Sequence, residues 1–400
     1  MSGAAACPVR RRFAVNVSRG ALATPLRNRI SETSLATLDG IWETGSVMPD
    51  RTSVPPFAPA SVVGTTLREH VLHGMHAAPG ATGEFTSLLN HISLAIRIIN
   101  SRVRAAGLAG LLGYTGETNV QGEEVQKLDA FSNEVLLNVL ERSGHCGVIA
   151  SEELDEAILE NNHGKYVALF DPLDGSSNID TNVGIGTIFA ILRRSDPKLS
   201  PPALADALRP GREIVAAGYV LYGPSTIFVL STGHGAHGFT LDPSIGEFFL
   251  SQPDIKCPSR GGCYSVNEGN YSRWTPEIQA WARWIKGEAP SKAASQGEEI
   301  KTPYGHRYVG SLVADAHRTL IKGGIFAYPA DAKSKNGKLR LLYEANPMAF
   351  LFEQAGGSAT NGKDRILDIM PTELHQRTPL VIGSKDDVAA FRQFVVGERS

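Results

Sequence analysis

The chain has 400 residues, of which 42% are hydrophobic, 20% charged and 7% aromatic, and this ordinary globular composition excludes a collagen, a coiled coil and a wholly disordered chain. Its 39 basic and 41 acidic side chains leave a formal net charge of -2, so no overall positive field favours a nucleic-acid or membrane partner. No apolar run approaches the roughly 18 residues of a membrane-spanning helix. Four cysteines are too few for a disulfide framework, which favours a reducing compartment.

The first 60 residues differ from the rest in composition. Residues 1–31 hold six arginines and no Asp or Glu, which is typical of a transit peptide, and the Pro-rich stretch V-P-P-F-A-P follows at 54–59. Because residues 1–60 show no sustained helical period, we expect them to form a disordered N-terminal extension of a cytoplasmic protein. Import into an organelle, directed by the Arg-rich segment, is the alternative.

Helix and strand patterns follow from about residue 66. Apolar residues first recur with a period of about 3.6, which predicts a long amphipathic helix. Its expected buried stripe is Phe85, Leu88, Leu89, Ile92, Leu94, Ala95, Ile98 and Ile99. A second helix is expected over about 122–143, with Gly144 as its stop. The short apolar runs 146–150 and 166–170 then predict strands that are buried on both faces.

The middle of the chain predicts a sheet, and the last third predicts alternating helices and strands. Strands are expected at 186–192, 214–222, 226–230, 238–241 and 247–250. After residue 257 the pattern indicates helices near 276–286 and 311–321, a strand at 324–328, and a helix that Asn346 caps and Pro347 opens. The fold class is therefore mixed α/β with two sheet regions.

The clearest chemical signal is D-P-L-D-G-S-S-N at 171–178, directly after the strand 166–170. Ligand sites of α/β proteins lie outside the carboxyl ends of buried strands. Pro172 and Gly175 bend the backbone, so that Asp171, Asp174 and the amides of 175–177 can converge. Acids hold hard cations, and backbone N–H groups hold phosphate oxygens. The alternative is an Asx turn in which Asp171 caps a following helix.

Further acids fit the same site. Glu152 and Glu153 follow the strand 146–150; alternatively a helix begins there and its N-terminus favours the two glutamates. Glu123 and Glu124 allow the same alternative, but Asp129 lies on an apolar stripe, where a carboxylate is costly unless paired or bound to a metal. Such a cluster needs cations, and oxygen ligands without Cys or His favour Mg²⁺ or Mn²⁺. Two or more divalent ions beside backbone amides are suited to hydrolysing a phosphate monoester.

Several motifs together resemble one enzyme family. G-E-T-N-V-Q-G-E-E-V-Q-K-L-D (116–129), S-E-E (151–153) and F-D-P-L-D-G-S-S-N-I-D (170–180) resemble fructose-1,6-bisphosphatase, a member of the lithium-sensitive sugar and inositol phosphatase superfamily. The D-P-L-D-G-S motif is shared across that superfamily, but four further motifs resemble fructose-1,6-bisphosphatase in particular. They are Y-S-V-N-E-G-N (264–270), Y-G-H-R-Y-V-G-S (304–311), G-G-I-F-A-Y-P-A (323–330) and G-K-L-R-L-L-Y-E-A-N-P-M (337–348). The resemblance covers about residues 65–395. It implies a layered α-β-α-β-α sugar phosphatase fold with two mixed sheets, and hydrolysis of the 1-phosphate of fructose 1,6-bisphosphate to fructose 6-phosphate in gluconeogenesis.

The resemblance also implies roles for individual residues. Two or more Mg²⁺ or Mn²⁺ ions per subunit are implied, with ligands at Glu123, Glu152, Asp171, Leu173 through its carbonyl, Asp174 and Glu344. Glu153 and Asp129 match the acids that handle the proton of the attacking water. The sugar and its 6-phosphate are implied to lie against Asn267, Arg307, Tyr308, Tyr328 and Lys338, with Ser176 and Ser177 near the 1-phosphate. In the family the residue matching Arg307 reaches in from a neighbouring subunit, so a homotetramer is implied.

A third group of matches lies far from the acids. In the animal-type enzymes the corresponding residues bind AMP, and here they are Thr82, Gly83, Glu84, Thr86, Lys165, Tyr166 and Arg193. The resemblance thus implies inhibition by AMP; the alternative is a capped helix beside two strand-edge cations. The chain departs from the family pattern in three places. Asn270 replaces a tyrosine that touches the 6-phosphate in many members, Glu123 replaces an Asp of the animal members, and residues 195–209 lack the cysteines of a thioredoxin-responsive loop.

Three segments are expected along the chain. They are the extension 1–60, an N-terminal domain over 61–256 with the metal acids and the AMP residues, and a C-terminal sugar-phosphate-binding domain over 257–400. The alternative activity is that of a sedoheptulose-1,7-bisphosphatase or a relaxed sugar bisphosphatase, because one added carbon is a small change for a pocket. A non-enzyme alternative is an inactive AMP-sensing scaffold with the same fold.

Overall fold

The structure is a computed structural model that describes residues 64–76, 83–109, 113–118, 124–159, 161–195, 197, 200–288 and 303–398, so the predicted extension 1–60 lies outside the described residues. The first third contains helices α1 (Leu67–His76), α2 (Glu84–Val103), α3 (Ala106–Ala109) and α4 (Lys127–Ser143), and strands β1 (Tyr114–Thr118) and β2 (Glu124–Gln126). The middle contains strands β3 (Cys146–Ser151), β4 (Ile158–Leu159), β5 (Tyr166–Asp174), β6 (Ile185–Arg193), β7 (Ile214–Tyr222), β8 (Thr226–Ser231), β9 (Ala236–Asp242) and β10 (Glu247–Ile255), and short helices η2 (Ser176–Thr181), η3 (Leu204–Asp206) and η4 (Gly211–Glu213). The last part contains β11 (Cys263–Ser265), η5 (Glu268–Arg273), α5 (Pro276–Ile285), β12 (Gly305–His306), α6 (Leu312–Lys322), β13 (Ile325–Tyr328), β14 (Leu339–Arg340), η7 (Leu341–Ala345), α7 (Asn346–Gln354), β15 (Ser358–Thr360), η8 (Ile366–Asp368), β16 (Arg377–Thr378), β17 (Leu380–Gly383) and α8 (Lys385–Val395).

The larger sheet has eight strands in the order β10-β9-β8-β7-β6-β5-β3-β4. Strand β3 runs parallel to β5, and the other neighbouring pairs are antiparallel. Every residue of β3 and β5 is buried, as their apolar runs predicted, because helices or the second sheet region cover both faces. Strand β5 continues beyond the predicted end at residue 170 to Asp174, because its pairing with β6 resumes after an irregularity between Asp171 and Asp174.

The smaller sheet has five strands in the order β12-β11-β13-β17-β15. Strand β11 is parallel to β12 and β13, whereas β17 is antiparallel to β13 and β15. Two two-stranded sheets, β1-β2 and β14-β16, accompany the large ones. The two large sheets are both mixed, which confirms the predicted fold class.

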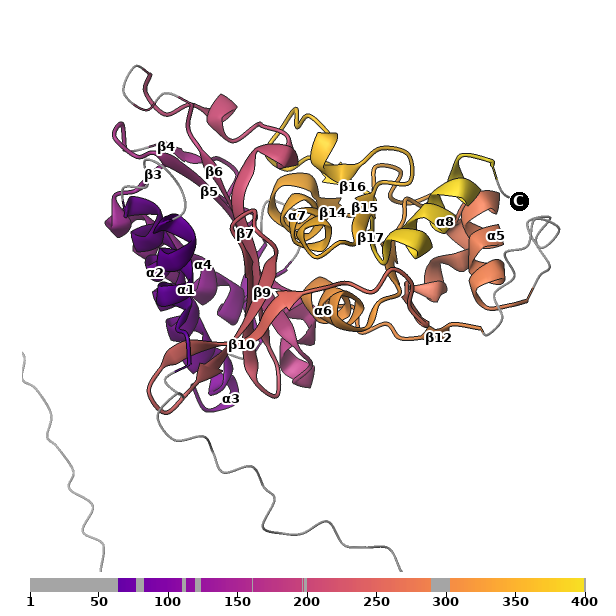
Figure 1. Cartoon of the computed structure of the whole chain (residues 1–400), viewed down its shortest axis with the longest axis horizontal. Coiled ribbons are helices and arrows are strands. Elements are labelled where there is room, and N and C mark those ends of the chain that lie inside the picture. Colours follow the sequence, from indigo (N-terminus) through magenta and orange to yellow (C-terminus); the bar gives the residue numbers. More distant parts are fainter. Residues whose placement is uncertain are drawn as a thin grey trace, which may run out of the picture. The chain divides into compact units, whose positions relative to one another are not determined.

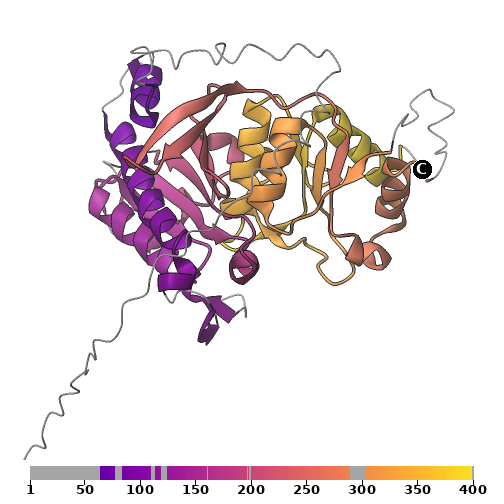
Figure 2. The same cartoon turned by 90° about the horizontal axis from the view of Figure 1, so that it is seen from below.

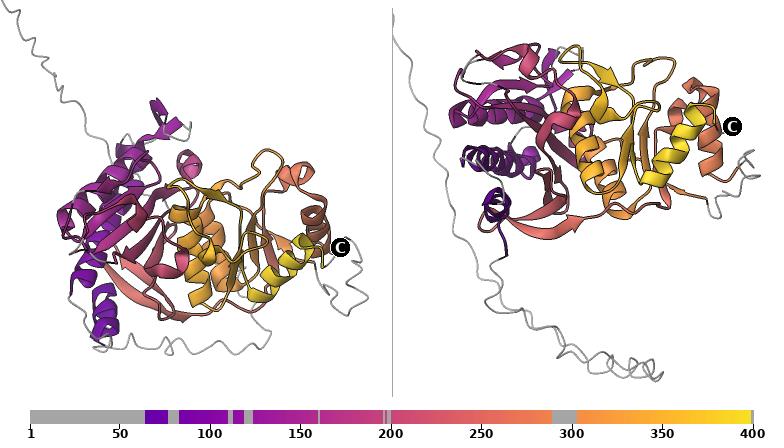
Figure 3. Two further views of the ribbon diagram at one scale, coloured as in Figure 1. Left: turned by 90° about the horizontal axis from the view of Figure 1, so that it is seen from above. Right: turned by 45° about the horizontal axis from the view of Figure 1, so that its top comes forward.

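Helices and sheets alternate in layers. Figure 1 shows α1, α2 and α4 on one face of the larger sheet, α6 and α7 between the two sheets, and α5 and α8 beyond the smaller sheet. The views in Figure 2 and Figure 3 show the same order of layers. Three clusters of buried apolar side chains fill the spaces between these layers. The layered α-β-α-β-α arrangement implied by the motifs is therefore confirmed.

Both predicted halves of the folded chain contribute to the central core. Residues 63–400 form one unit, and the cluster between the sheets packs Ile188 of β6 together with Met348 of α7, each with 0% exposure. In the outermost layer the rings of Trp281 and Phe391 join α5 to α8, with centroids 4.9 Å apart. Among the described helices, none is long and apolar enough to cross a membrane.

Two helices correct the sequence-based expectations. In α2 the expected buried residue Leu94 is 43% exposed and Ile96 is buried instead, because a residue two positions after Ile92 lies on the opposite side of a helix. Helix α4 begins at Lys127 and not near residue 122, since β2 pairs with β1 and Gln126 keeps an extended backbone. Its predicted stop is confirmed, because Gly144 has a φ of 68° and closes the helix in the left-handed conformation.

Candidate active site

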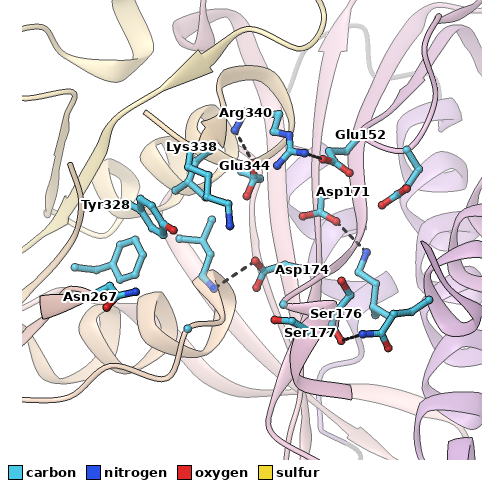
Figure 4. A pocket seen from close by; sticks show the side chains of 18 of the residues that line it. Glu152, Asp171, Asp174, Ser176, Ser177, Asn267, Tyr328, Lys338, Arg340 and Glu344 are labelled. Atoms are coloured by element: carbon cyan, nitrogen blue, oxygen red, sulfur yellow. Dashed lines mark hydrogen bonds and ion pairs between the residues drawn. The ribbon is translucent and has the colours of Figure 1, made fainter. Parts of the chain in front are cut away.

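A cavity of about 600 Å³ lies where the ends of β3 and β5 meet the segments around α6 and η7. It contains most of the predicted metal, catalytic and substrate residues, namely Glu152, Glu153, Asp171, Leu173, Asp174, Ser176, Ser177, Asn267, Tyr308, Tyr328, Lys338 and Glu344. Figure 4 shows the labelled acids on one side of the cavity and Asn267 and Tyr328 on the other, with Lys338 between them. The predicted ligand Glu123 lies outside the described residues.

The parallel strands β3 and β5 bring the first acids together. Glu152 follows β3 directly, and its backbone N–H donates to the carbonyl of Phe170 in β5 (3.0 Å). Asp171 accepts the N–H of Leu173 (2.9 Å), which is the Asx turn of the alternative. Strand β5 continues to Asp174, so this turn does not cap a helix and that part of the alternative is wrong. A turn, and no helix, follows β3, so the helix-capping alternative for Glu152 and Glu153 is wrong as well.

Glu344 reaches the cavity from one turn of π-helix, η7, that runs into α7. This turn makes Asn346 the first residue of α7, so the prediction that Asn346 caps a free helix end is wrong. Isolated π-helical turns are frequent at functional sites because they shift side chains around the helix. The backbone N–H of Arg340 donates to Glu344 Oε2 (2.6 Å) and thereby orients the carboxylate.

Three buried carboxylates form the centre of the site. Oxygen atoms of Asp171, Asp174 and Glu344 all lie within 4.8 Å of one another. Burial raises the pKa of Asp171 well above its ordinary value, and the charges of Glu152 and Glu344 raise it further. Burial likewise raises the pKa of Glu344 to about 7 and that of Asp174 to about 6. An oxygen-only set of acids that resists joint ionisation fits a hard divalent cation.

Glu152 completes the acid cluster beside a cation from the protein itself. Its carboxylate pairs with the guanidinium of Arg340 and shares a hydrogen bond with Glu153. Burial nevertheless raises the pKa of Glu152 to about 8, because the Arg340 charge offsets the desolvation only in part. Arg340 was missed by the sequence reasoning, since its position four residues before Glu344 has no distinct signal.

Asp174 is anchored by the N-terminus of α6. It accepts the hydroxyl of Ser311 (3.0 Å) and the backbone N–H groups of Leu312 (3.3 Å) and Val313 (2.8 Å). Gly175 follows with a φ of 77°, and a Cβ there would lie 2.9 Å from the Cβ of Ser311. Only glycine therefore allows the acid-bearing turn to lie this close to α6.

The turn after Gly175 presents Ser176 and Ser177 at the start of η2. The side chain of Gln126 in β2 donates to the carbonyl of Ser176 (2.8 Å) and lines the same cavity. Gln126 was also missed, because its position depends on the pairing of β2, which the expected helix over 122–143 excluded.

Two predicted residues are not among those that line the cavity. Asp129 is buried in the first turn of α4, as its place on the apolar stripe indicated. Arg307 is exposed, and its guanidinium donates to the carbonyl of His306 (2.7 Å). Its neighbour Tyr308 does line the cavity, because successive residues of an extended segment point in opposite directions.

The predicted AMP residues meet at a second place, at the start of α2. The ammonium of Lys165 pairs with the carboxylate of Glu84 (2.5 Å), and Tyr166 and Arg193 are opposite each other in β5 and β6. Gly83 is the N-cap of α2, with a φ of 77°, and a glycine has no side chain with which to cap the helix. Thr86 is buried close by in α2, and Thr82 lies outside the described residues.

Comparisons with known proteins agree with this geometry. The sequence models of two domains match the chain, "Fructose-1-6-bisphosphatase, N-terminal domain" over residues 65–253 and "Fructose-1-6-bisphosphatase, C-terminal domain" over 257–396. A fructose-1,6-bisphosphatase class 1 of Sorangium cellulosum is 58% identical over 348 residues, which cover 86% of this chain and 97% of that protein. A second one, from Chloroherpeton thalassium, is 54% identical and covers 84% of this chain and 94% of that protein.

Solved structures show the same relationship. The holo form of Leishmania major fructose-1,6-bisphosphatase superposes with a TM-score of 0.76 at 42% identity, covering 83% of this chain and 98% of the other. The T-state of the same protein gives a TM-score of 0.72 at 41% identity, with the same two coverages. Since the two domain models match residues 65–253 and 257–396, which is more than half of the chain, the chain belongs to the fructose-1,6-bisphosphatase family.

Proposed function

We propose that the chain hydrolyses the 1-phosphate of fructose 1,6-bisphosphate, a gluconeogenic reaction, with two or more Mg²⁺ or Mn²⁺ ions bound by the acids at the ends of β3, β5 and η7. The observation that carries the proposal is the joint cavity of acids and sugar-phosphate residues. Glu152, Asp171, Asp174 and Glu344 would hold the ions, together with the carbonyl of Leu173 and with Glu123. Bound ions of this kind lower the pKa of water and offset the charge of a transferring phosphate.

The other residues of the cavity recognise the substrate in this proposal. The ammonium of Lys338 and the phenols of Tyr308 and Tyr328 suit a phosphate dianion, and the side-chain amide of Asn267 suits a sugar hydroxyl. Residues 257–400 supply these contacts, whereas residues 61–256 supply most of the acids. Ser176 and Ser177 start a helical turn whose N–H groups face the departing 1-phosphate. Arg307 would reach a phosphate in a neighbouring subunit.

A substrate screen tests the proposed activity. With Mg²⁺ or Mn²⁺ we expect release of inorganic phosphate and formation of fructose 6-phosphate from fructose 1,6-bisphosphate. A sedoheptulose-1,7-bisphosphatase would instead show the higher kcat/KM on the seven-carbon sugar. Failure of a folded sample to release phosphate from either sugar with both ions would contradict the proposal and favour the inactive AMP-sensing scaffold.

AMP binding at the start of α2 is a second part of the proposal. The N-terminal N–H groups of α2, Lys165 and Arg193 supply donors that suit a nucleotide phosphate, and the phosphate would compete with Glu84 for the ammonium of Lys165. We expect Lys165→Ala to raise the AMP concentration for half-inhibition about 10-fold or more, since a hydrogen bond between charged groups is lost. Lys256→Ala is the matched control, because Lys256 forms an exposed ion pair with Asp254. Equal AMP sensitivity of the two variants would refute this site.

Assembly and compartment complete the proposal. We propose a homotetramer, which sedimentation or light scattering of the purified protein tests directly; a monomeric mass would contradict it. We place the protein in the cytoplasm, with an organelle as the alternative. Fluorescent fusions with and without residues 1–60 separate the two, because a change of location on truncation would favour the organelle.

A further inference from the structure

Asp315 is a buried acid that none of the motifs pointed to. It lies in the first turn of α6, and its side chain is 0% exposed. Its carboxylate accepts the backbone N–H of Val309 at both oxygens (3.1 and 3.0 Å) and that of Gly310 at Oδ2 (3.0 Å). The guanidinium of Arg318 adds an ion pair (3.0 Å). The charge of Asp315 is thus fully matched inside the protein.

The backbone N–H groups that donate to Asp315 belong to the loop 307–310. Arg318 extends the same network, because its Nη2 also donates to the carbonyl of Arg307 (3.0 Å). This loop carries Tyr308 into the cavity, and Gly310 lines the cavity too. One carboxylate and one guanidinium therefore hold both ends of the loop.

The same turn of α6 also holds one of the proposed metal-binding carboxylates. Asp174 accepts from Ser311, Leu312 and Val313, which lie directly between the loop and Asp315 in the sequence. Helix α6 therefore connects two parts of the cavity. Its N-terminus holds Asp174, and its side chains Asp315 and Arg318 hold the loop of Tyr308. The spacing between the acids and the sugar-phosphate residues depends on both attachments.

We propose that Asp315, with Arg318, is a positioning residue that holds Tyr308 at the correct distance from Asp174 for the bisphosphate to span the cavity. This role rests on the proposed function and adds a residue to it. An asparagine in place of Asp315 keeps the size of the side chain but removes its charge. Its amide NH₂ group cannot accept a hydrogen bond, so it would face the N–H donors of Val309, Gly310 or Arg318 without pairing with them. A buried donor left without an acceptor destabilises the loop and not the acid cluster.

Steady-state kinetics of Asp315→Asn test the role. We expect KM for fructose 1,6-bisphosphate to rise about 10-fold and kcat to change much less, because the loss is in binding of the sugar phosphate. Fructose 6-phosphate, titrated by calorimetry in the presence of Mg²⁺, should bind weaker by a similar factor. Arg318→Gln should shift KM in the same direction, and the double variant should be less than additive since the two residues share one network.

Asp387→Asn is the matched control. Asp387 is also a buried acid in the first turn of a helix, and it accepts the N–H of Gly261 (2.9 Å) and the hydroxyl of Tyr304 (2.8 Å). It does not line the cavity, so this variant should lower the Tm without raising KM. If Asp315→Asn fails to fold, Arg318→Gln carries the test, because the Arg318 side chain is 26% exposed.

The outcomes separate this role from the proposed function. An active wild type whose Asp315→Asn and Arg318→Gln variants keep the wild-type KM would overturn the positioning role alone. An equal rise of KM in Asp387→Asn would overturn it as well, because general destabilisation would then explain the effect. A wild type that releases no phosphate would overturn the proposed function, and this role with it.

Discussion

Replacing Glu153 by glutamine is expected to lower kcat by about 10²–10⁴-fold, because a positioned acid or base contributes that much to proton transfer. Glu153 lines the cavity, is partly exposed, and shares a hydrogen bond with the carboxyl of Glu152. Glutamine has nearly the same shape but cannot take or release the proton of an attacking water. KM for the sugar bisphosphate should therefore stay close to that of the wild type.

Glu156→Gln is the control for this prediction. Glu156 is an exposed acid in the segment between β3 and β4 and does not line the cavity. The rate of phosphate release, measured at saturating substrate and metal, should be about 10²–10⁴-fold lower for Glu153→Gln than for Glu156→Gln. A Glu153→Gln variant with the kcat of Glu156→Gln would exclude Glu153 as the proton-handling acid.

Removing divalent ions is expected to abolish phosphate release and to make the fold sensitive to alkaline pH. Burial raises the pKa of Glu152 to about 8 and that of Glu344 to about 7, each from an ordinary value of 4.5. At a pH between the ordinary pKa and the raised pKa, the folded, metal-free protein holds protons that the unfolded chain has released. The free energy of unfolding therefore falls as the pH rises from about 5 to 8, by an amount on the order of a few kcal/mol.

Thermal unfolding with and without Mg²⁺ at several pH values checks this expectation. Metal replaces the protons of the cluster, so the rise in Tm on adding Mg²⁺ should be larger at pH 8 than at pH 5.5. Glu344→Gln removes one buried acid, so its metal-free form should lose less stability on going to pH 8 and should gain less from Mg²⁺. A rise in Tm that is equal at both pH values would show that the acid cluster does not bind the metal.

Regular elements of this protein follow from local patterns in the sequence. The apolar runs before Ser151 and Asp171 are recognisable because a strand buried on both faces is continuously apolar. The end of α4 is recognisable at Gly144, where a left-handed residue closes the helix. The elements that were predicted wrongly depend on partners far away in the sequence. Helix α4 starts late because β2 pairs with β1, and Asn346 lies inside a helix because η7 precedes it.

The candidate site divides in the same way. Its acids at 152–153 and 171–174 are visible in the sequence, because each group follows a strand, and parallel neighbouring strands end at one edge of a sheet. Glu344 was reached only through the resemblance of its motif. Arg340 and Gln126 were not found at all, since a single Arg or Gln without periodic context is a common surface residue.

The amino-acid sequence by itself determined the fold class, the order of most helices and strands, and most of the carboxylates that line the cavity. These properties depend on periodicity and on residues close together in the chain. Only the tertiary structure decided which acids touch, that Arg340 pairs with Glu152, and that α6 ties Asp174 to the loop of Tyr308. The contacts of Arg340 with Glu152 and of Asp174 with α6 join segments more than a hundred residues apart. Their geometry is set by the packing of the two sheets around α6 and α7.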